Sequence, residues 1–301
     1  MKILIIRAGA LGDTLMLMPS IKAMRDEHEV IIAGRSPGIE YLDPWVEKCI
    51  DLERGEWHKL YSTHARFDTL LTTPDQVTGF LNDTDNIIRD NLSHLFPGAK
   101  IDIFPPFPEP DSETHVAIYM AKAIKSTGIR IDPHAAFYEA YKKPVIRAKT
   151  GKGKRIVLHP GSGSIKKNYP PELWLDLLRC IREKIMTTPY EINVLIGPAE
   201  EGIIKAFDNN ADIYISQDRE HLLSILDNTC LYIGHDSGVT HLAAMMGINT
   251  IALFRKSRVK NWGPVGPNVK IIEEKDGTKS AQNKTFALVL EIIRQMGDIC
   301  T

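Results

Sequence analysis

Two short loops rich in glycine and serine carry groups suited to binding an anion. The first spans His159–Ser164 (HPGSGS) and the second spans Asp236–His241 (DSGVTH). Each follows a strand-like apolar run and leads into a helical pattern, which leaves backbone N–H groups available and adds the partial positive charge of the helix dipole. Two such loops in one chain suit the two phosphates of one diphosphate. The pattern therefore predicts a nucleotide-sugar site, with Lys166 and Lys167 just beyond the first loop.

A further carboxylate, Asp13, follows the first strand-like run in the turn Arg7–Asp13 (RAGALGD). This turn has only two of the three glycines of a dinucleotide fingerprint, and an acid would face the cofactor phosphates, so a dehydrogenase is disfavoured. Two roles for Asp13 remain open. It caps its helix, or it accepts a proton from a substrate hydroxyl, because α/β sheets bind ligands at the carboxyl ends of their strands.

Short apolar runs that alternate with helical patterns must position these groups. The predicted strands are Ile3–Arg7, Val30–Ala33, Ile50–Leu52, Thr69–Thr72, Ile156–His159, Ile192–Ile196, Ile213–Ile215, Leu231–Ile233, Thr250–Phe254 and Val269–Ile272. The predicted helices lie near Asp13–Arg25, His115–Ser126, Pro171–Ile185, Arg219–Asp227 and Ala281–Met296. With 301 residues the chain exceeds the usual size of one core. We therefore expect an α/β protein of two lobes, each with a parallel sheet covered on both faces.

Composition excludes several classes of protein. The 37 basic and 38 acidic residues nearly cancel, which argues against a general nucleic-acid binder. The four cysteines are scattered without metal-ligand spacing, so we expect reduced thiols and no structural zinc. No apolar run approaches the roughly 20 residues that a membrane helix requires, and Arg7 interrupts the apolar start of the chain. These features favour a cytoplasmic protein.

A basic segment separates the two halves of the chain. Residues 142–155 contain seven lysines and arginines, two glycines and no acid. We interpret the segment as a linker between a first domain of residues 1–145 and a second of residues 146–280. The C-terminal helix, residues 281–301, is a candidate to cross back onto the first domain. The linker is either simply solvated or attracts anionic lipid or a phosphorylated acceptor at the inner membrane surface.

Four motifs in order resemble one family, the ADP-heptose:lipopolysaccharide heptosyltransferases. The motifs are Ile6–Asp13 with Pro19, His159–Ser164 with Lys167 and Pro170, Asp236–Ala244, and Phe254 with Trp262-Gly263-Pro264. The resemblance covers nearly the whole chain. It implies a GT-B fold of two Rossmann-like lobes, with the acceptor mainly on the first and the nucleotide sugar mainly on the second. It also implies an inverting transfer that needs no metal or cofactor, from ADP-heptose to a glycolipid or oligosaccharide acceptor of the lipopolysaccharide-core type.

The resemblance also implies roles for single residues. Asp13 would be the general base, and Lys167 would stabilise the departing diphosphate, with Lys166 as the competing assignment. Asp236 would bind sugar hydroxyls and His241 the diphosphate or the sugar, against the alternatives of a capping aspartate and a packed histidine. Glu200 or Glu201 would hold the ribose, with Glu200 preferred, against the alternative that the two form an exposed pair at the start of a helix. The donor-binding candidates are Ser162, Gly163, Ser164, Lys167, Glu200, Glu201, Asp236, Ser237, Gly238 and His241.

Acceptor recognition is expected in the first lobe, where basic residues cluster. The candidates are Gly12, Arg54, His58, Lys59, His64 and Arg66, although scattered surface charge explains the cluster equally well. Asp83-Thr84-Asp85 resembles a metal-binding DxD motif but is interpreted as a loop. His235 and His241 form a poor zinc pattern.

The chain departs from the family pattern at two places. Arg255-Lys256 replaces the Gly-Pro that is common after the last motif strand, and Tyr169 stands where Trp is usual. These departures bear on the preference for nucleotide and sugar. Two other classes stay open: a nonhydrolysing sugar-nucleotide epimerase, which would need further acid and base groups in its cleft, and a nucleotide-sugar-binding protein without catalysis.

Overall fold

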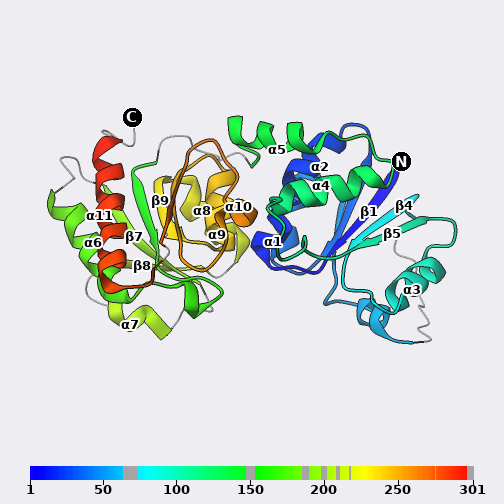
Figure 1. Cartoon of the computed structure of the whole chain (residues 1–301), viewed down its shortest axis with the longest axis horizontal. Helices are drawn as coiled ribbons and strands as arrows, with labels where there is room; N and C mark the ends of the chain where they lie inside the picture. Colours follow the sequence, from blue (N-terminus) through cyan, green and yellow to red (C-terminus); the bar gives the residue numbers. More distant parts are fainter. Residues whose placement is uncertain are drawn as a thin grey trace. The chain divides into compact units, whose positions relative to one another are not determined.

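Two parallel sheets organise the chain, as the alternating pattern predicts (Figure 1). The computed structural model describes residues 1–63, 73–146, 153–184, 190–197, 202–207, 211–216, 218–274 and 276–296. The chain divides into one unit of Met1–Glu139 and another of Ala140–Thr301. This division falls within α5 (Pro133–Lys142), slightly before the expected boundary. Residues 147–152 of the basic linker and the predicted strand Thr69–Thr72 lie outside the described residues.

The first unit contains a five-stranded sheet in the order β3-β2-β1-β4-β5, with every neighbouring pair parallel. Its strands are β1 (Lys2–Arg7), β2 (Glu29–Gly34), β3 (Lys48–Asp51), β4 (Gln76–Phe80) and β5 (Lys100–Phe104). Its helices are α1 (Leu11–Leu15), α2 (Met18–Met24), α3 (Ile87–Leu95), α4 (Val116–Ser126) and the start of α5, with 3-10 helices η1 (Gly38–Trp45) and η2 (Trp57–Tyr61). Central β1 is apolar over Ile3–Ile6 and fully buried there, as expected for a strand covered on both faces.

Two features of this unit differ from the sequence predictions. The single helix predicted near Asp13–Arg25 is two helices, α1 and α2, and Pro19 stands in the first turn of the second, where proline is tolerated. Strands β4 and β5 were not predicted. All of β4 is buried although its sequence, QVTGF, holds no continuous apolar run.

The second unit contains a six-stranded parallel sheet in the order β11-β10-β9-β6-β7-β8. Its strands are β6 (Arg155–His159), β7 (Glu191–Ile196), β8 (Asp212–Ile215), β9 (Thr229–His235), β10 (Asn249–Phe254) and β11 (Val269–Glu273). Its helices are η3 (Ile165–Lys167), α6 (Pro171–Lys184), α7 (Ile204–Phe207), α8 (Arg219–Asp227), α9 (Gly238–Met245), α10 (Val259–Trp262) and α11 (Lys279–Gln295). The predicted strands of this half all lie within these six.

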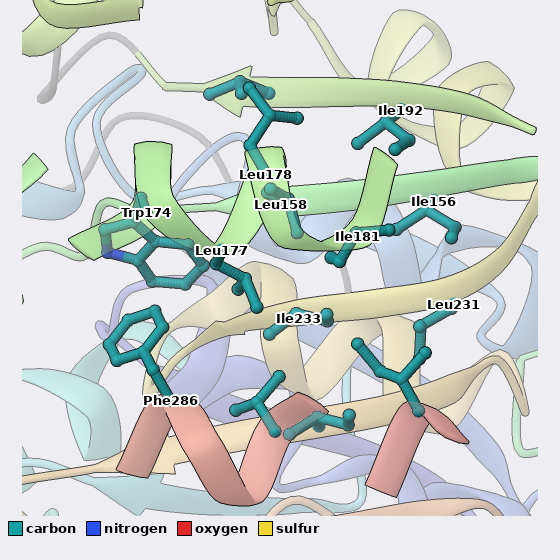
Figure 2. Packing of buried hydrophobic residues seen from close by; sticks show 14 of the residues in the cluster. Ile156, Leu158, Trp174, Leu177, Leu178, Ile181, Ile192, Leu231, Ile233 and Phe286 are labelled. Carbon is teal, nitrogen blue, oxygen red and sulfur yellow. The ribbon is translucent and has the colours of Figure 1, made fainter. Parts of the chain in front are cut away.

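Helices α6 and α11 pack against the same face of this sheet (Figure 2). Trp174 on α6 is fully buried and meets Phe286 on α11 edge to face, with ring centroids 5.5 Å apart. Phe286, Val289 and Ile293 form one apolar stripe on α11 and belong to the core of the second unit. This stripe packs α11 against the second sheet beside α6, and the option that the C-terminal helix also reaches the first domain stays a prediction.

The cysteines differ from expectation at one position. Cys49 and Cys180 are free thiols, as predicted, but Cys230 is disulfide-bonded. In the described part of the chain, no helix is long and apolar enough to cross a membrane.

Candidate active site

The two predicted anion-binding loops leave neighbouring strands at the same edge of the second sheet. Strands β6 and β9 pair in parallel, with His159 opposite Gly234, so the loops that follow them begin side by side. The first loop continues into η3, which carries Lys167, and the second continues into α9. This is the edge at which parallel α/β sheets bind ligands.

Lys167, Asp236 and His241 form a charged cluster between these loops. The Lys167 Nζ donates a hydrogen bond to Asp236 Oδ2 at 2.6 Å, and His241 Nε2 lies 3.6 Å from Asp236 Oδ1. The side chains of Asp236 and His241 are 8% and 3% exposed, whereas that of Lys167 is 32% exposed. Lys167 is therefore the member of the cluster that solvent or a ligand can reach.

Asp236 remains ionised although it is buried. Burial on its own raises the pKa of this carboxyl group, but His241, Lys167 and Ser257 together lower the pKa below its ordinary value of 3.8. A permanent negative charge at Asp236 holds the ammonium group of Lys167 at the mouth of the two loops. The prediction that Asp236 binds sugar hydroxyls is untested, and this contact gives it a second role, the anchoring of Lys167.

Serine side chains shape both loops. Ser237 is the N-cap of α9 and accepts a hydrogen bond from Thr240 N at 3.3 Å. The helix geometry leaves the N–H groups of Gly238 and Val239 without intrahelical acceptors. In the first loop, Ser162 Oγ bridges the carbonyl oxygen of Ser164 and the side chain of Asn168. Eight of the ten predicted donor residues thus belong to these two loops and their first turns, namely Ser162, Gly163, Ser164, Lys167, Asp236, Ser237, Gly238 and His241.

A buried polar network beneath the second loop was not predicted. The hydroxyl of Tyr232 lies 2.7 Å from His159 Nδ1 and 3.2 Å from Thr240 Oγ1, and Thr240 also bonds the backbone oxygen of His235. Gly234 makes room for this hydroxyl, because a Cβ at that position would lie 2.6 Å from it. The signal in the sequence was a tyrosine and a glycine two positions apart, on one face of a fully buried strand.

Asp13 forms a helix cap in the first unit. Its Oδ2 accepts a hydrogen bond from Ala10 N at 3.0 Å, which gives the capping-box contact of α1. Gly9 allows the side chain to fold back, since a Cβ there would lie 2.4 Å from Asp13 Cβ. The side chain is 23% exposed. The cap does not decide between a capping role and a proton-accepting role for Asp13. It uses only Oδ2, whereas Oδ1 lies beside a different side chain.

That group is the buried guanidinium of Arg7, whose Nη2 lies 3.6 Å from Asp13 Oδ1. Burial lowers the pKa of Arg7, and the charges of Asp13 and Tyr119 partly oppose this effect. The guanidinium also lies over the ring of Phe107, 4.7 Å from its centroid. Arg7 was not singled out from the sequence as a functional residue, and it places a fixed positive charge beside Asp13.

The predicted acceptor cluster contains acidic side chains beside its basic ones. Arg54 pairs with Asp51 at 3.3 Å, and Lys59 pairs with Glu56, so acids of the same unit neutralise part of its charge. His64 and Arg66 lie outside the described residues, as do Glu200 and Glu201. The acceptor assignment stays a prediction.

The Asp83-Thr84-Asp85 segment is a turn that precedes α3. Both carboxylate oxygens of Asp83 accept backbone hydrogen bonds, from Ile88 at 2.9 Å and Arg89 at 3.0 Å, which supports the interpretation as a loop. Among the residues that the structure describes, no three His, Cys, Asp or Glu side chains are grouped so that they could hold a metal ion.

Comparison with known proteins agrees with the fold and the motifs. The sequence model of glycosyltransferase family 9 (heptosyltransferase) matches residues 108–288, more than half of the chain. No curated protein sequence matches.

Solved structures show the same fold at low sequence identity. The E. coli heptosyltransferase WaaC with ADP has a TM-score of 0.69 at 15% identity, over 97% of this chain and 99% of that one. A family 9 glycosyl transferase from Veillonella parvula has a TM-score of 0.70 at 14% identity, over 98% and 97%. E. coli ADP-heptose lps heptosyltransferase II has a TM-score of 0.68 at 13% identity, over 98% and 99%. The expected GT-B fold class is confirmed.

Proposed function

The chain belongs to glycosyltransferase family 9, the heptosyltransferases, and from that premise we propose that it moves a heptose from ADP-heptose to an acceptor hydroxyl. The proposed acceptor is a saccharide of the lipopolysaccharide-core type. The proposed reaction inverts the anomeric centre and needs no metal ion. The choice of nucleotide is supported by the similar E. coli enzyme, whose structure holds ADP.

The observation that carries the proposal is the Lys167–Asp236 pair at the mouth of two small-residue loops. An ammonium group has three N–H donors, and Asp236 occupies one of them. The others are available to a diphosphate seated against the backbone N–H groups at the start of α9. Lysine and helix terminus together provide the positive charge that an anionic leaving group requires.

The same groups can stabilise the transition state. Negative charge grows on the diphosphate as the bond to the sugar breaks, and fixed donors aimed at that charge lower the barrier without reorganisation. His241 lies beside Asp236 and its side chain is nearly buried. We therefore assign it a fixed place in the site and not the role of a side chain that moves to the substrate to donate a proton. A divalent cation is not needed for the charge to be met in this scheme.

Asp13 is the proposed general base. Its carboxylate stands at the carboxyl end of β1, where ligands approach a parallel sheet, and it is accessible to a hydroxyl group. Removal of the hydroxyl proton as the oxygen attacks the anomeric carbon from the face opposite the diphosphate gives inversion in one displacement. The guanidinium of Arg7, with Nη2 3.6 Å from Asp13 Oδ1, helps to hold the carboxylate in place.

The acceptor and the cellular site are proposed from charge alone. A lipid-anchored acceptor would bring the enzyme to the inner surface of the membrane. The exposed lysines Lys142 and Lys143, at the described end of the basic linker, are suited to contact with anionic headgroups there.

The deciding experiment is incubation with a panel of sugar nucleotides, with and without a lipid-core acceptor, followed by measurement of nucleoside diphosphate release. Release from ADP-heptose that depends on the acceptor supports the proposal. A new sugar nucleotide formed without acceptor would identify an epimerase instead. Tight binding of the sugar nucleotide with no turnover under either condition would identify a binding protein.

Two variants assign the roles within that assay. Asp13→Asn should lower turnover by about 10² to 10⁴ while it leaves ADP affinity unchanged. Lys167→Ala should weaken ADP binding in calorimetry by about 1 to 3 kcal/mol, because a charge-assisted contact is lost. Lys166→Ala is the matched control, since this exposed neighbour should have little effect. Equal effects of the two lysine changes would contradict the assignment of Lys167.

A further inference from the structure

Arg255, the first residue after β10, reaches across to the loop that carries Lys167. Its Nη1 donates a hydrogen bond to the backbone oxygen of Asn168 at 2.5 Å, and its Nε donates to Glu274 Oε2 at 3.1 Å. The side chains of Arg255 and Glu274 are 12% and 3% exposed. A buried guanidinium with a carboxylate on one side and a carbonyl on the other has little freedom to move.

The two departures from the family pattern lie in contact with each other. The guanidinium of Arg255 is stacked on the ring of Tyr169, 4.6 Å from its centroid. The Tyr169 hydroxyl lies 3.5 Å from Thr285 Oγ1, and its ring stacks on His235 with centroids 5.4 Å apart. The contact ties the end of β10 to the segment that follows η3.

Both members of the Lys167–Asp236 pair adjoin residues that this contact holds. Asn168, the neighbour of Lys167, is bonded by Arg255 at its carbonyl and by Ser162 Oγ at its side chain. Tyr169 N donates to the Nε2 atom of His235, the residue before Asp236, at 2.9 Å. A shift of residues 168 and 169 would therefore change the distance between Lys167 Nζ and Asp236 Oδ2, because it would move the backbone next to each of these two residues.

We propose that Arg255 is a positioning residue that fixes Lys167 for binding of the donor diphosphate, with Glu274 and Tyr169 holding the guanidinium in place. The proposal rests on the proposed function, in which Lys167 contacts the diphosphate. Arg255 acts through the backbone of residue 168 and does not touch the ligand. Removal of its side chain should loosen the loop and lower donor affinity through Lys167 alone.

The chain offers a control with the same kinds of contact in Arg155, at the start of β6, whose partner glutamate is 67% exposed where Glu274 is 3% exposed. Arg155 also pairs with a glutamate, Glu191 at 3.2 Å, donates to a backbone oxygen, that of Ile225, and lies over a tyrosine ring, that of Tyr214 at 5.1 Å. Its side chain is 15% exposed, close to the value for Arg255. Arg155 lies at the amino end of β6, whereas the anion-binding loop follows the carboxyl end of this strand. Arg155→Met therefore measures the effect of losing such an arginine on the stability of the unit, without an effect on the loop.

The first measurement needs no ligand. In Arg255→Met, and in the double variant Arg255→Met/Glu274→Gln that leaves no unpaired buried charge, amide hydrogen exchange should be at least about fivefold faster at residues 167–169 than in the wild type. Arg155→Met should leave exchange at these residues unchanged. Unchanged exchange in both Arg255 variants would overturn the proposal.

The second measurement is a double-mutant cycle on ADP affinity by calorimetry. Arg255→Met/Glu274→Gln should weaken ADP binding about tenfold in the wild-type background and less than about twofold in the Lys167→Met background. An equal loss in both backgrounds would overturn the proposal, because Arg255 would then act on ADP independently of Lys167. If Lys167→Met itself left ADP affinity unchanged, the proposed donor site would be wrong, and the exchange data would still decide whether Arg255 orders the loop.

Discussion

Replacement of Asp236 by asparagine should cost the second unit measurable stability at neutral pH. Asp236→Asn keeps the shape of the side chain but removes the charge that pairs with Lys167 at 2.6 Å. A hydrogen bond to a charged group contributes about 1.5 to 3 kcal/mol. Lys167 is 32% exposed and can regain water, and His241 at 3.6 Å is too distant for a strong hydrogen bond. We therefore expect a loss of about 2 kcal/mol rather than the 3 to 5 kcal/mol typical of a fully buried pair.

The effect should depend on pH in a defined direction. The folded-state pKa of Asp236 is lowered below its ordinary value of 3.8. Its charge therefore contributes stability that is complete above the unfolded-state pKa and is lost as the pH falls through the lower folded-state pKa. The difference between wild type and Asp236→Asn should be constant near neutral pH and shrink steadily as the pH is lowered below 3.8.

Urea unfolding followed by hydrogen exchange in β6 and β9 would measure this difference in the second unit. The control is Asp176→Asn on α6, where the pair with Arg179 at 3.2 Å is 63% to 64% exposed and should contribute at most about 0.5 kcal/mol. An Asp236 effect no larger than the Asp176 effect would refute the reasoning. So would a difference that stayed constant down to the lowest pH at which the protein folds.

Three further predictions follow from the geometry of the two units. Gly9→Ala places a Cβ 2.4 Å from Asp13 Cβ and should displace the proposed base. In steady-state kinetics kcat should fall at least about tenfold with the KM for donor unchanged, and a raised KM alone would contradict this. Gly234→Ala places a Cβ 2.6 Å from the Tyr232 hydroxyl and should destabilise the protein by about 1 to 3 kcal/mol in urea unfolding, with partial recovery when Tyr232→Phe is added. Turnover should persist in excess chelator, because in the proposed mechanism Lys167 and the start of α9 meet the charge of the leaving group. Activity lost in chelator and restored by magnesium or manganese would show that a metal is required.

The second unit could be predicted from the sequence more fully than the first. Strands such as β6, β9 and β10 each contain a continuous apolar run that is buried, and such runs are readily recognised. Strand β4 is also buried throughout, yet Gln76, Thr78 and Gly79 break its apolar pattern. Its burial results from its place between β1 and β5, which no local pattern records.

The candidate site shows the same limit. The sequence predicted both loops and their residues because local signals, a strand end followed by glycine, serine and a helix start, mark each loop. It did not predict that Lys167 and Asp236 pair with each other, since 69 residues separate them. The contact of Arg255 with Glu274 and Tyr169 also depends on tertiary packing, and the sequence showed these positions only as departures from a pattern.

The pairing of Lys167 with Asp236 has a consequence for the turnover cycle. In the proposed donor site, Asp236 is a resident anion that a ligand phosphate must share or displace before it gains the full attraction of Lys167. This internal competition lowers the affinity for every diphosphate, including the spent nucleotide, by the free energy of the contact that is given up. In this scheme the Asp236 carboxylate pairs with the Lys167 ammonium group again as the product departs. If Lys167 contacts the diphosphate as proposed, we therefore expect the buried charge of Asp236 both to speed release of the product and to keep the loop in shape for the next donor.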